Sequence, residues 1–161
     1  MRLLRKLISN IIYAVCLALA LFTAFLLFGK YKVYVVETGS MEPDYPVGSV
    51  LFVKECEPET LSENDVITFQ KNGATVTHRI VKVNKDERTF VTKGDANASE
   101  DIRPVSFDSL IGIVRLCVPN MGTAVMYLSS AYGKVGIVAL ALIGVLIDPG
   151  KKEGKKNEDK V

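Results

Sequence analysis

Four side chains in this sequence could together carry out nucleophilic catalysis. Ser40 lies in a turn of small residues, where its hydroxyl should be exposed, and His78 is the only histidine of the chain. Two carboxylates, Asp95 and Asp101, follow the histidine. A serine nucleophile, a general base and an orienting acid form a catalytic triad, here in an order unlike those of chymotrypsin, subtilisin and the α/β-hydrolases.

Each of these residues also has an ordinary structural interpretation. A serine after glycine is common in turns, and Asp95 follows Gly94 in a sequence typical of a turn. In an extended strand His78 shares a face with Val76, which fits a packed core residue as well as a partly buried base. A desolvated lysine could replace the histidine as base. However, four nearby lysines are interpreted as solvated charges at strand ends and turns: Lys54, Lys71, Lys82 and Lys85.

An uncharged run before Ser40 predicts a membrane anchor. Residues 7–28 carry no charge, and roughly 22 apolar residues span a bilayer as a helix. The basic residues in 1–6 predict a cytoplasmic N-terminus. Residues 29–32 do not resemble an Ala-x-Ala cleavage site, so a retained anchor is favoured over a cleaved signal peptide. Ser40 would then lie about a dozen residues beyond the bilayer, within roughly 40 Å of its surface.

The region from 29 to 122 is expected to form a β-rich extracytoplasmic domain. Short runs of β-branched and aromatic residues predict strands at Val33–Val36, Ser49–Val53, Val66–Phe69, Ala74–Val83, Arg88–Thr92 and Leu110–Val118. Asn72 and Gly73 predict a hairpin turn, because both residues tolerate positive φ. The fold class expected is mainly β: a small antiparallel sheet curled into a partial barrel and flanked by transmembrane helices.

A second hydrophobic stretch covers residues 123–147. It is long enough to span a bilayer, but Lys134 interrupts it, and a charge at mid-depth is costly unless it snorkels or is paired. The alternative is an amphipathic helix lying on the membrane surface. Residues 148–161 form a basic tail, predicted to be disordered and cytoplasmic, so both termini are expected inside and the β domain outside.

Composition argues against several other classes. The formal net charge is +2, which does not support nucleic-acid binding. The three cysteines, Cys16, Cys56 and Cys117, are odd in number and lack metal-like spacing. Cys56 and Cys117 could in principle form one bridge, but a disulfide framework or a zinc site is not expected. No metal, nucleotide or other cofactor is predicted.

Five sequence motifs, in order, resemble those of type I signal peptidases. They are Thr38-Gly39-Ser40-Met41-Glu42-Pro43, Val47-Gly48-Ser49-Val50-Leu51, Asn64-Asp65-Val66-Ile67-Thr68-Phe69, Thr77-His78-Arg79-Ile80-Val81 and Lys93-Gly94-Asp95-Ala96-Asn97. One branch of this family uses a Ser/Lys dyad and the other, peptidase family S26B, has His in place of Lys. His78 directly before Arg79 resembles the second branch, which occurs in archaea, the endoplasmic reticulum and some Gram-positive bacteria. Two departures, Thr38 for the usual serine and Ala96 before Asn97, remove no catalytic group.

The resemblance implies a role for each candidate residue. Ser40 would be the nucleophile and His78 the general base, with Asp101 or Asp95 as the orienting acid. The Ser40 N–H and the Thr38 hydroxyl would form the oxyanion hole. The expected function is removal of signal peptides from secretory preproteins, after small residues at −1 and −3, at the plasma membrane and near the Sec translocon. The alternatives are a Ser/Lys peptidase of the same fold and a non-catalytic, membrane-anchored β module that binds a partner.

Overall fold

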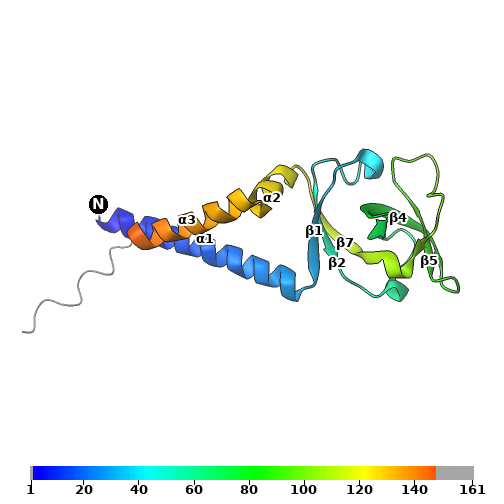
Figure 1. Cartoon of the computed structure of the whole chain (residues 1–161), viewed down its shortest axis with the longest axis horizontal. Helices are drawn as coiled ribbons and strands as arrows, with labels where there is room; N and C mark the ends of the chain where they lie inside the picture. Colours follow the sequence, from blue (N-terminus) through cyan, green and yellow to red (C-terminus); the bar gives the residue numbers. More distant parts are fainter. Residues whose placement is uncertain (1, 148–161) are drawn as a thin grey trace, which may run out of the picture. The chain divides into compact units, whose positions relative to one another are not determined.

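The computed structural model describes residues 2–147 of the chain. It divides into two compact units. One unit, Leu26–Met126, contains the β-sheet, and the other is formed by the helical ends of the chain. Figure 1 follows the chain from the N-terminal helix through the strands to the C-terminal helices.

The β unit is one seven-stranded antiparallel sheet. Its strands are β1 (Tyr31–Val35), β2 (Val50–Lys54), β3 (Val66–Lys71), β4 (Ala74–Asn84), β5 (Thr89–Lys93), β6 (Val105–Ser106) and β7 (Leu110–Val118). They lie in the order β1-β2-β7-β3-β4-β5-β6, and every neighbouring pair is antiparallel. In the described sheet β1 and β6 are free edges, so the sheet is not closed. The prediction of a mainly β, antiparallel, incompletely closed fold is therefore confirmed, although the two-residue β6 was not anticipated.

The predicted hairpin turn joins β3 to β4. Asn72 has φ 52° and Gly73 has φ 81°, as the primed hairpin turns require. Positive φ at both central residues matches the twist of the two strands, so the register between β3 and β4 runs without interruption from Val66 opposite Arg79 to Lys71 opposite Ala74.

The core lies where β3 crosses the middle of the sheet. Four consecutive β3 residues, Val66 to Phe69, are buried, as in a strand that is covered on both faces. The Phe90 and Phe107 rings stack beside it with centroids 4.4 Å apart. Three register shifts interrupt the β2–β7, β3–β7 and β4–β5 pairings, and such bulges increase local twist and bend a sheet. The sheet can therefore wrap around this core.

The helical unit contains the N-terminal helix α1 (Arg2–Phe28) and the C-terminal helix α3 (Ala131–Ile147). Among the described residues, α1 is the one unbroken helix long and apolar enough to cross a membrane. The second hydrophobic stretch is broken: α2 (Gly122–Ser129) and α3 meet at a bend of 73°. Ser130 lies at this break, and its Oγ accepts a hydrogen bond from the Gly133 N–H at 3.2 Å, which caps the start of α3. The two helices qualify as a membrane span only if they are taken together.

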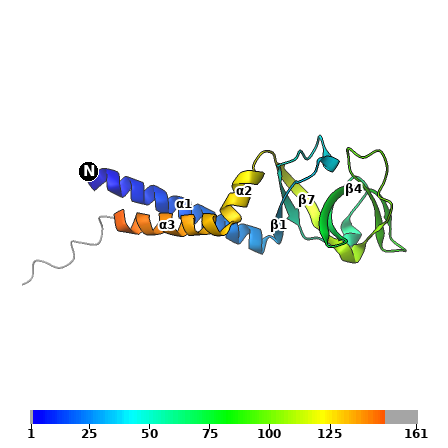
Figure 2. The same cartoon turned by 45° about the horizontal axis from the view of Figure 1, so that its top comes forward.

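Helices α1 and α3 lie side by side, as Figure 2 shows. The Ser9 hydroxyl on α1 donates a hydrogen bond of 3.0 Å to the Gly144 carbonyl on α3. A Cβ on Gly144 would lie only 2.9 Å from Ile12 Cγ2, so the glycine allows the two helices to approach closely. Small residues play this part wherever apolar helices pack without a hydrophobic driving force between them.

Candidate active site

The central contact of the candidate site joins His78 on β4 to Asp101 in the loop after β5. His78 Nδ1 lies 2.8 Å from Asp101 Oδ2. The histidine side chain is 9 % exposed and that of Asp101 is 12 % exposed, so the pair is largely withdrawn from water. The Phe69 ring covers the imidazole edge-on, with the ring centroids 6.3 Å apart. Strand β4 therefore carries the candidate base, and the loop after β5 carries the carboxylate that contacts it.

Asp101 is held in place by two further contacts. Its backbone N–H donates a hydrogen bond of 2.8 Å to the Thr92 carbonyl, which fixes the loop against β5. The Thr92 hydroxyl, which is fully buried, donates to Asp101 Oδ2 at 2.7 Å. Partial burial would by itself raise the pKa of the Asp101 carboxyl. The hydrogen bonds from Thr92 and His78, with the charges of His78 and Lys71, instead hold that pKa below its ordinary value.

The ionised carboxylate determines which ring nitrogen of His78 carries hydrogen. A carboxylate without a proton only accepts hydrogen bonds, so Nδ1 must be the donor. In the neutral imidazole the lone pair then lies on Nε2. The His78–Asp101 contact therefore favours the tautomer that a general base needs.

Ser40 lies in the short 3₁₀ helix η1 (Gly39–Met41), which packs against β4. The adjacent Met41 side chain is buried and anchors the turn, whereas Ser40 is partly exposed. Ser40 Oγ has one hydrogen-bond partner among the described residues, Thr38 Oγ1 at 3.5 Å, and that partner is not His78. Hydrogen bonds between a nucleophile and its base are often long in the absence of substrate and shorten in the complex.

A second link ties the Ser40 turn to the loop that carries the acids. The Ala96 N–H donates a hydrogen bond of 2.9 Å to the Ser40 carbonyl. This close approach requires glycine at position 94, because a Cβ there would lie 2.6 Å from the Ser40 carbonyl oxygen. Ser40 and the loop that carries the two candidate acids are therefore linked through the backbone.

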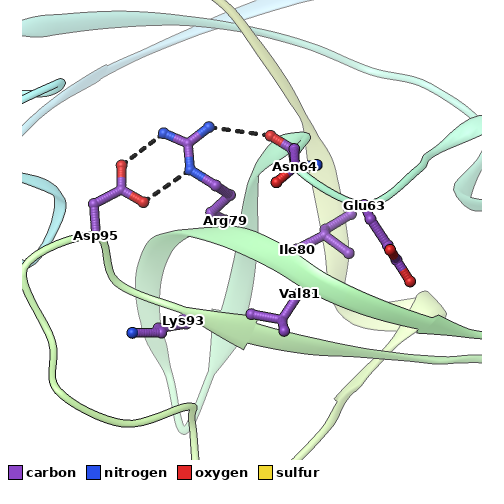
Figure 3. Close-up of a pocket in the computed structure, with 7 residues that line it drawn as sticks. All are labelled: Glu63, Asn64, Arg79, Ile80, Val81, Lys93 and Asp95. Atoms are coloured by element: carbon purple, nitrogen blue, oxygen red, sulfur yellow. Dashed lines mark hydrogen bonds and ion pairs between the residues drawn. The ribbon is translucent and has the colours of Figure 1, made fainter.

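Asp95 is bound to Arg79 rather than to His78. Arg79 donates from Nε to Asp95 Oδ1 at 2.8 Å and from a terminal nitrogen to Oδ2 at 2.6 Å, the bidentate geometry that Figure 3 shows. The same guanidinium reaches Asp44, just after the Ser40 turn, at 3.0 Å and the Asn64 carbonyl at 3.1 Å. This cluster holds four segments of the β unit together, and Asp95 belongs to it.

The cavity drawn in Figure 3 has a volume of about 290 Å³ and lies at this Arg79 cluster. Arg79 follows His78 on β4, and successive residues of a strand point to opposite faces. Arg79 and Asp95 line the cavity whereas His78 and Asp101 do not, so we assign it to the ion-pair cluster rather than to the catalytic chemistry. No group of three or more metal-ligating side chains occurs in residues 2–147, and Cys16, Cys56 and Cys117 are all free thiols.

Three contributors to the site were not singled out from the sequence. Thr92 gave no signal beyond strand propensity, and Gly94 stood out only as part of its motif. Lys71 was interpreted as a solvated turn charge, but its Nζ lies 3.6 Å from Asp101 Oδ2 with the side chain 32 % exposed. The predicted hairpin contained one signal for Lys71, because its pairing with Ala74 puts Lys71 on the same face of the sheet as His78.

Comparison with known proteins agrees with the resemblance seen in the sequence. The model of the family "Signal peptidase, peptidase S26" matches residues 4–89, which include Ser40 and His78. Signal peptidase I W of Bacillus subtilis (strain 168) is 40% identical over 120 residues, covering 65% of this chain and 63% of that protein. The signal peptidase complex catalytic subunit SEC11 of Scheffersomyces stipitis is 27% identical over 128 residues, 71% of this chain and 76% of its own length. The SEC11 subunit of Komagataella phaffii is 26% identical over 157 residues, which cover 81% of this chain and 91% of that protein. The chain belongs to the signal peptidase family, peptidase S26.

Proposed function

We propose that this chain is a membrane-bound serine endopeptidase that cleaves N-terminal signal peptides from secreted preproteins. The observation that carries the proposal is the 2.8 Å contact between His78 Nδ1 and Asp101 Oδ2, in a chain of the signal peptidase family whose Ser40 turn packs against the same strand. The names of the relatives, a signal peptidase I and signal peptidase catalytic subunits, support the same activity.

The reaction would proceed by acyl transfer through Ser40. His78 Nε2 takes the Ser40 hydroxyl proton as Oγ attacks the scissile carbonyl, and then returns it to the leaving amine. Asp101 holds the imidazole in the required tautomer and stabilises the imidazolium. The Ser40 N–H and the Thr38 hydroxyl would donate to the oxyanion. Water then hydrolyses the acyl-enzyme by the same route, with His78 again as base.

The substrate is expected to bind as an added strand beside His78. Strand β4 runs from Ala74 to Asn84 but pairs with β5 only from Arg79 onward. In the described sheet, the β5-side edge of residues 74–78 therefore has no strand partner. Such an edge offers backbone hydrogen bonds to an extended peptide, and shallow pockets beside it would select small residues at −1 and −3.

We further propose that the catalytic unit works outside the plasma membrane, anchored by α1 and near the Sec translocon. An unbroken apolar helix of 26 residues, Leu3–Phe28, supports the anchor, and the basic residues before it support a cytoplasmic N-terminus. A signal peptide that is still in the bilayer would then present its cleavage site close to Ser40.

Cleavage of a purified preprotein by the full chain in detergent micelles tests the proposal. Ser40→Ala and His78→Ala should each abolish cleavage while membrane insertion and thermal stability are retained, because triad members act as a unit. Wild-type-like cleavage by Ser40→Ala would reject Ser40 as the nucleophile. His78→Lys examines the Ser/Lys alternative, since a lysine on this strand would use the chemistry of the other branch. Absence of any cleavage by the wild-type chain would favour the non-catalytic binding module.

A further inference from the structure

One oxygen of Asp101 accepts two hydrogen bonds and also lies at ion-pair distance from an ammonium. Oδ2 lies 2.8 Å from His78 Nδ1, 2.7 Å from the Thr92 hydroxyl and 3.6 Å from Lys71 Nζ. The imidazole therefore shares its carboxylate with a neutral donor from the buried face of β5 and a cation from the end of β3. We propose that Lys71 is a positioning residue that lowers the proton affinity of the His78–Asp101 pair, so that His78 stays neutral and able to act as a base at lower pH.

The physical reason is the placement of a like charge next to the imidazolium. When His78 is protonated, Asp101 stabilises it, but the Lys71 ammonium on the same oxygen opposes that stabilisation. When His78 is neutral, Lys71 keeps Asp101 ionised and fixed as the acceptor from Nδ1. Lys71 therefore favours the neutral imidazole. This role deepens the proposed peptidase function and rests on it for its biological meaning.

Other charged groups around β4 are engaged elsewhere. They are Arg79 on β4 itself, Lys93 at the end of β5, Asp95 in the loop beyond it, and Glu42 and Asp44 after η1. Arg79 binds Asp95 and Asp44, and Lys93 lines the cavity of that cluster. The Glu42 carboxylate lies beside Gly39. Among the described residues, the ionic contacts of Asp101 are those with His78 and Lys71.

The single histidine makes a direct test possible without measuring cleavage. The full chain, labelled with ¹³C and ¹⁵N in histidine, is prepared without a histidine tag in the Ser40→Ala background, and the imidazole signals are titrated by NMR. Lys71→Met should raise the titration midpoint by roughly half a pH unit, the size expected of a partly exposed ion pair. Lys71→Arg keeps the charge and should leave the midpoint in place. Lys82→Met, an exposed lysine further along β4, is the matched control and should also leave it in place.

Two further readouts separate a charge effect from a structural one. At about 1 M salt the Debye length falls to roughly 3 Å, so the midpoint of the Lys71 form should move toward that of Lys71→Met. The cleavage assay uses the chain with Ser40 intact. There, Lys71→Met should move the acid limb of the kcat/KM profile to higher pH by the same half unit, and should leave the value of kcat/KM on the alkaline plateau within about twofold. At pH values below the midpoint of the acid limb, a shift of half a pH unit corresponds to a roughly threefold loss of kcat/KM.

The proposal is overturned if the NMR midpoint is unchanged in Lys71→Met, or if Lys71→Arg shifts it as much as Lys71→Met does. An equal loss of activity at every pH also overturns it, since that result would make Lys71 a structural residue or the base itself. The NMR titration requires no substrate. A failure of the proposed peptidase activity would therefore leave this test intact, and a failure here would leave the cleavage result unaffected.

Discussion

Asp95 and Asp101 carry the same carboxylate, six residues apart, but their surroundings give them different tasks. Asp101 is hydrogen-bonded to the imidazole and the Thr92 hydroxyl and forms an ion pair with the Lys71 ammonium. Asp95 is bonded to a guanidinium that also reaches two other segments of the β unit. This difference favours Asp101 as the orienting acid and Asp95 as a structural one.

We therefore expect Asp101→Asn to reduce kcat far more than Asp95→Asn does. An asparagine at 101 would favour the wrong imidazole tautomer, an effect of about ten-thousand-fold when the equivalent acid of a serine protease is changed. Asp95→Asn leaves Arg79 without its bidentate partner and should lower the free energy of unfolding by about 1–3 kcal/mol. Cleavage rate and thermal unfolding, measured on both variants and on the corresponding alanine variants, distinguish the two effects. An inactive but fully stable Asp95→Asn would reverse the two assignments.

The sequence singles out Ser40 and His78 as candidates but does not choose between the two acids. The serine and the histidine lie in short motifs that, taken together and in order, resemble those of one family. The acids lie in a loop, and their partners are set by which face of β4 each of them meets. Arg79 follows His78 directly, so one step along the strand changes the partner from Asp101 to Asp95.

At the scale of elements, the loop after β5 carries both candidate acids and contacts the backbone of the candidate nucleophile. Its Ala96 N–H binds the Ser40 carbonyl, and Gly94 is the residue that permits the approach. A turn that reaches across to η1 links two motifs that are more than fifty residues apart in the sequence. The backbone of this turn is therefore as important to the site as its side chains.

Gly94→Ala tests this positioning. The added methyl would meet backbone, the Ser40 carbonyl oxygen at 2.6 Å, so the turn or η1 must move. We expect a loss of at least about tenfold in kcat, since a displacement of 1 Å at a catalytic group can cost a hundredfold. Gly136→Ala on α3, where a Cβ meets nothing within 4 Å, is the matched control and should retain full activity. A fully active Gly94→Ala would show that the turn does not position Ser40.

Six of the seven described strands were predictable from the sequence because each is a short run rich in β-branched or aromatic residues and bounded by turn formers, whereas the two-residue β6 was not. The Asn72-Gly73 hairpin has the conformation expected of it. The break between α2 and α3 was not predicted. Residues 123–147 are apolar on both sides of Ser130, so hydropathy alone favours one helix. What interrupts it is a local competition, in which the Ser130 side chain bonds the Tyr127 carbonyl and the Gly133 N–H across the break.

A substitution at Gly144 tests the close contact between α1 and α3. Gly144→Leu would place a side chain where Ile12 already lies and should separate the helices, at a cost of about 1–2 kcal/mol. Thermal unfolding and limited proteolysis of the full chain in detergent micelles would measure the loss. Gly136→Leu lies on the same helix in open space and should have little effect. Equal behaviour of the two variants would show that the Ser9–Gly144 contact does not hold the helices together.

At the scale of the whole molecule, the arrangement of the chain across the membrane determines which compartment the site can serve. The Ser9–Gly144 bond joins the beginning of α1 to the end of α3, so these two helix ends lie at the same level. With α1 in the membrane, the chain would then leave α3 on the side where α1 begins. Basic residues in both terminal segments favour the cytoplasm for that side.

The weak point of this arrangement is the length and charge of the second hydrophobic stretch. Helix α3 has 17 residues, or about 26 Å, just short of a hydrocarbon core of roughly 30 Å. Lys134 lies in its first turn, at the end nearer α2, where a long side chain can reach the interface rather than remain at mid-depth. A two-span topology therefore remains our prediction, with the tail that follows, outside the described residues, in the cytoplasm.

Thiol labelling decides this topology. All three native cysteines are replaced, and one new cysteine is placed at Asn157 in the tail or, as a control, at Asn72 in the exposed β3–β4 turn. On intact cells an impermeant maleimide should label Asn72→Cys but not Asn157→Cys, and permeabilised cells should label both. The reason is that two membrane crossings return the chain to the cytoplasm, whereas one crossing leaves both positions outside. Labelling of Asn157→Cys from outside would mean that residues 123–147 do not cross the bilayer. Helix α1 would then be the single anchor, and the assignments of Ser40 and His78 would be unaffected, because both residues lie between the two hydrophobic stretches.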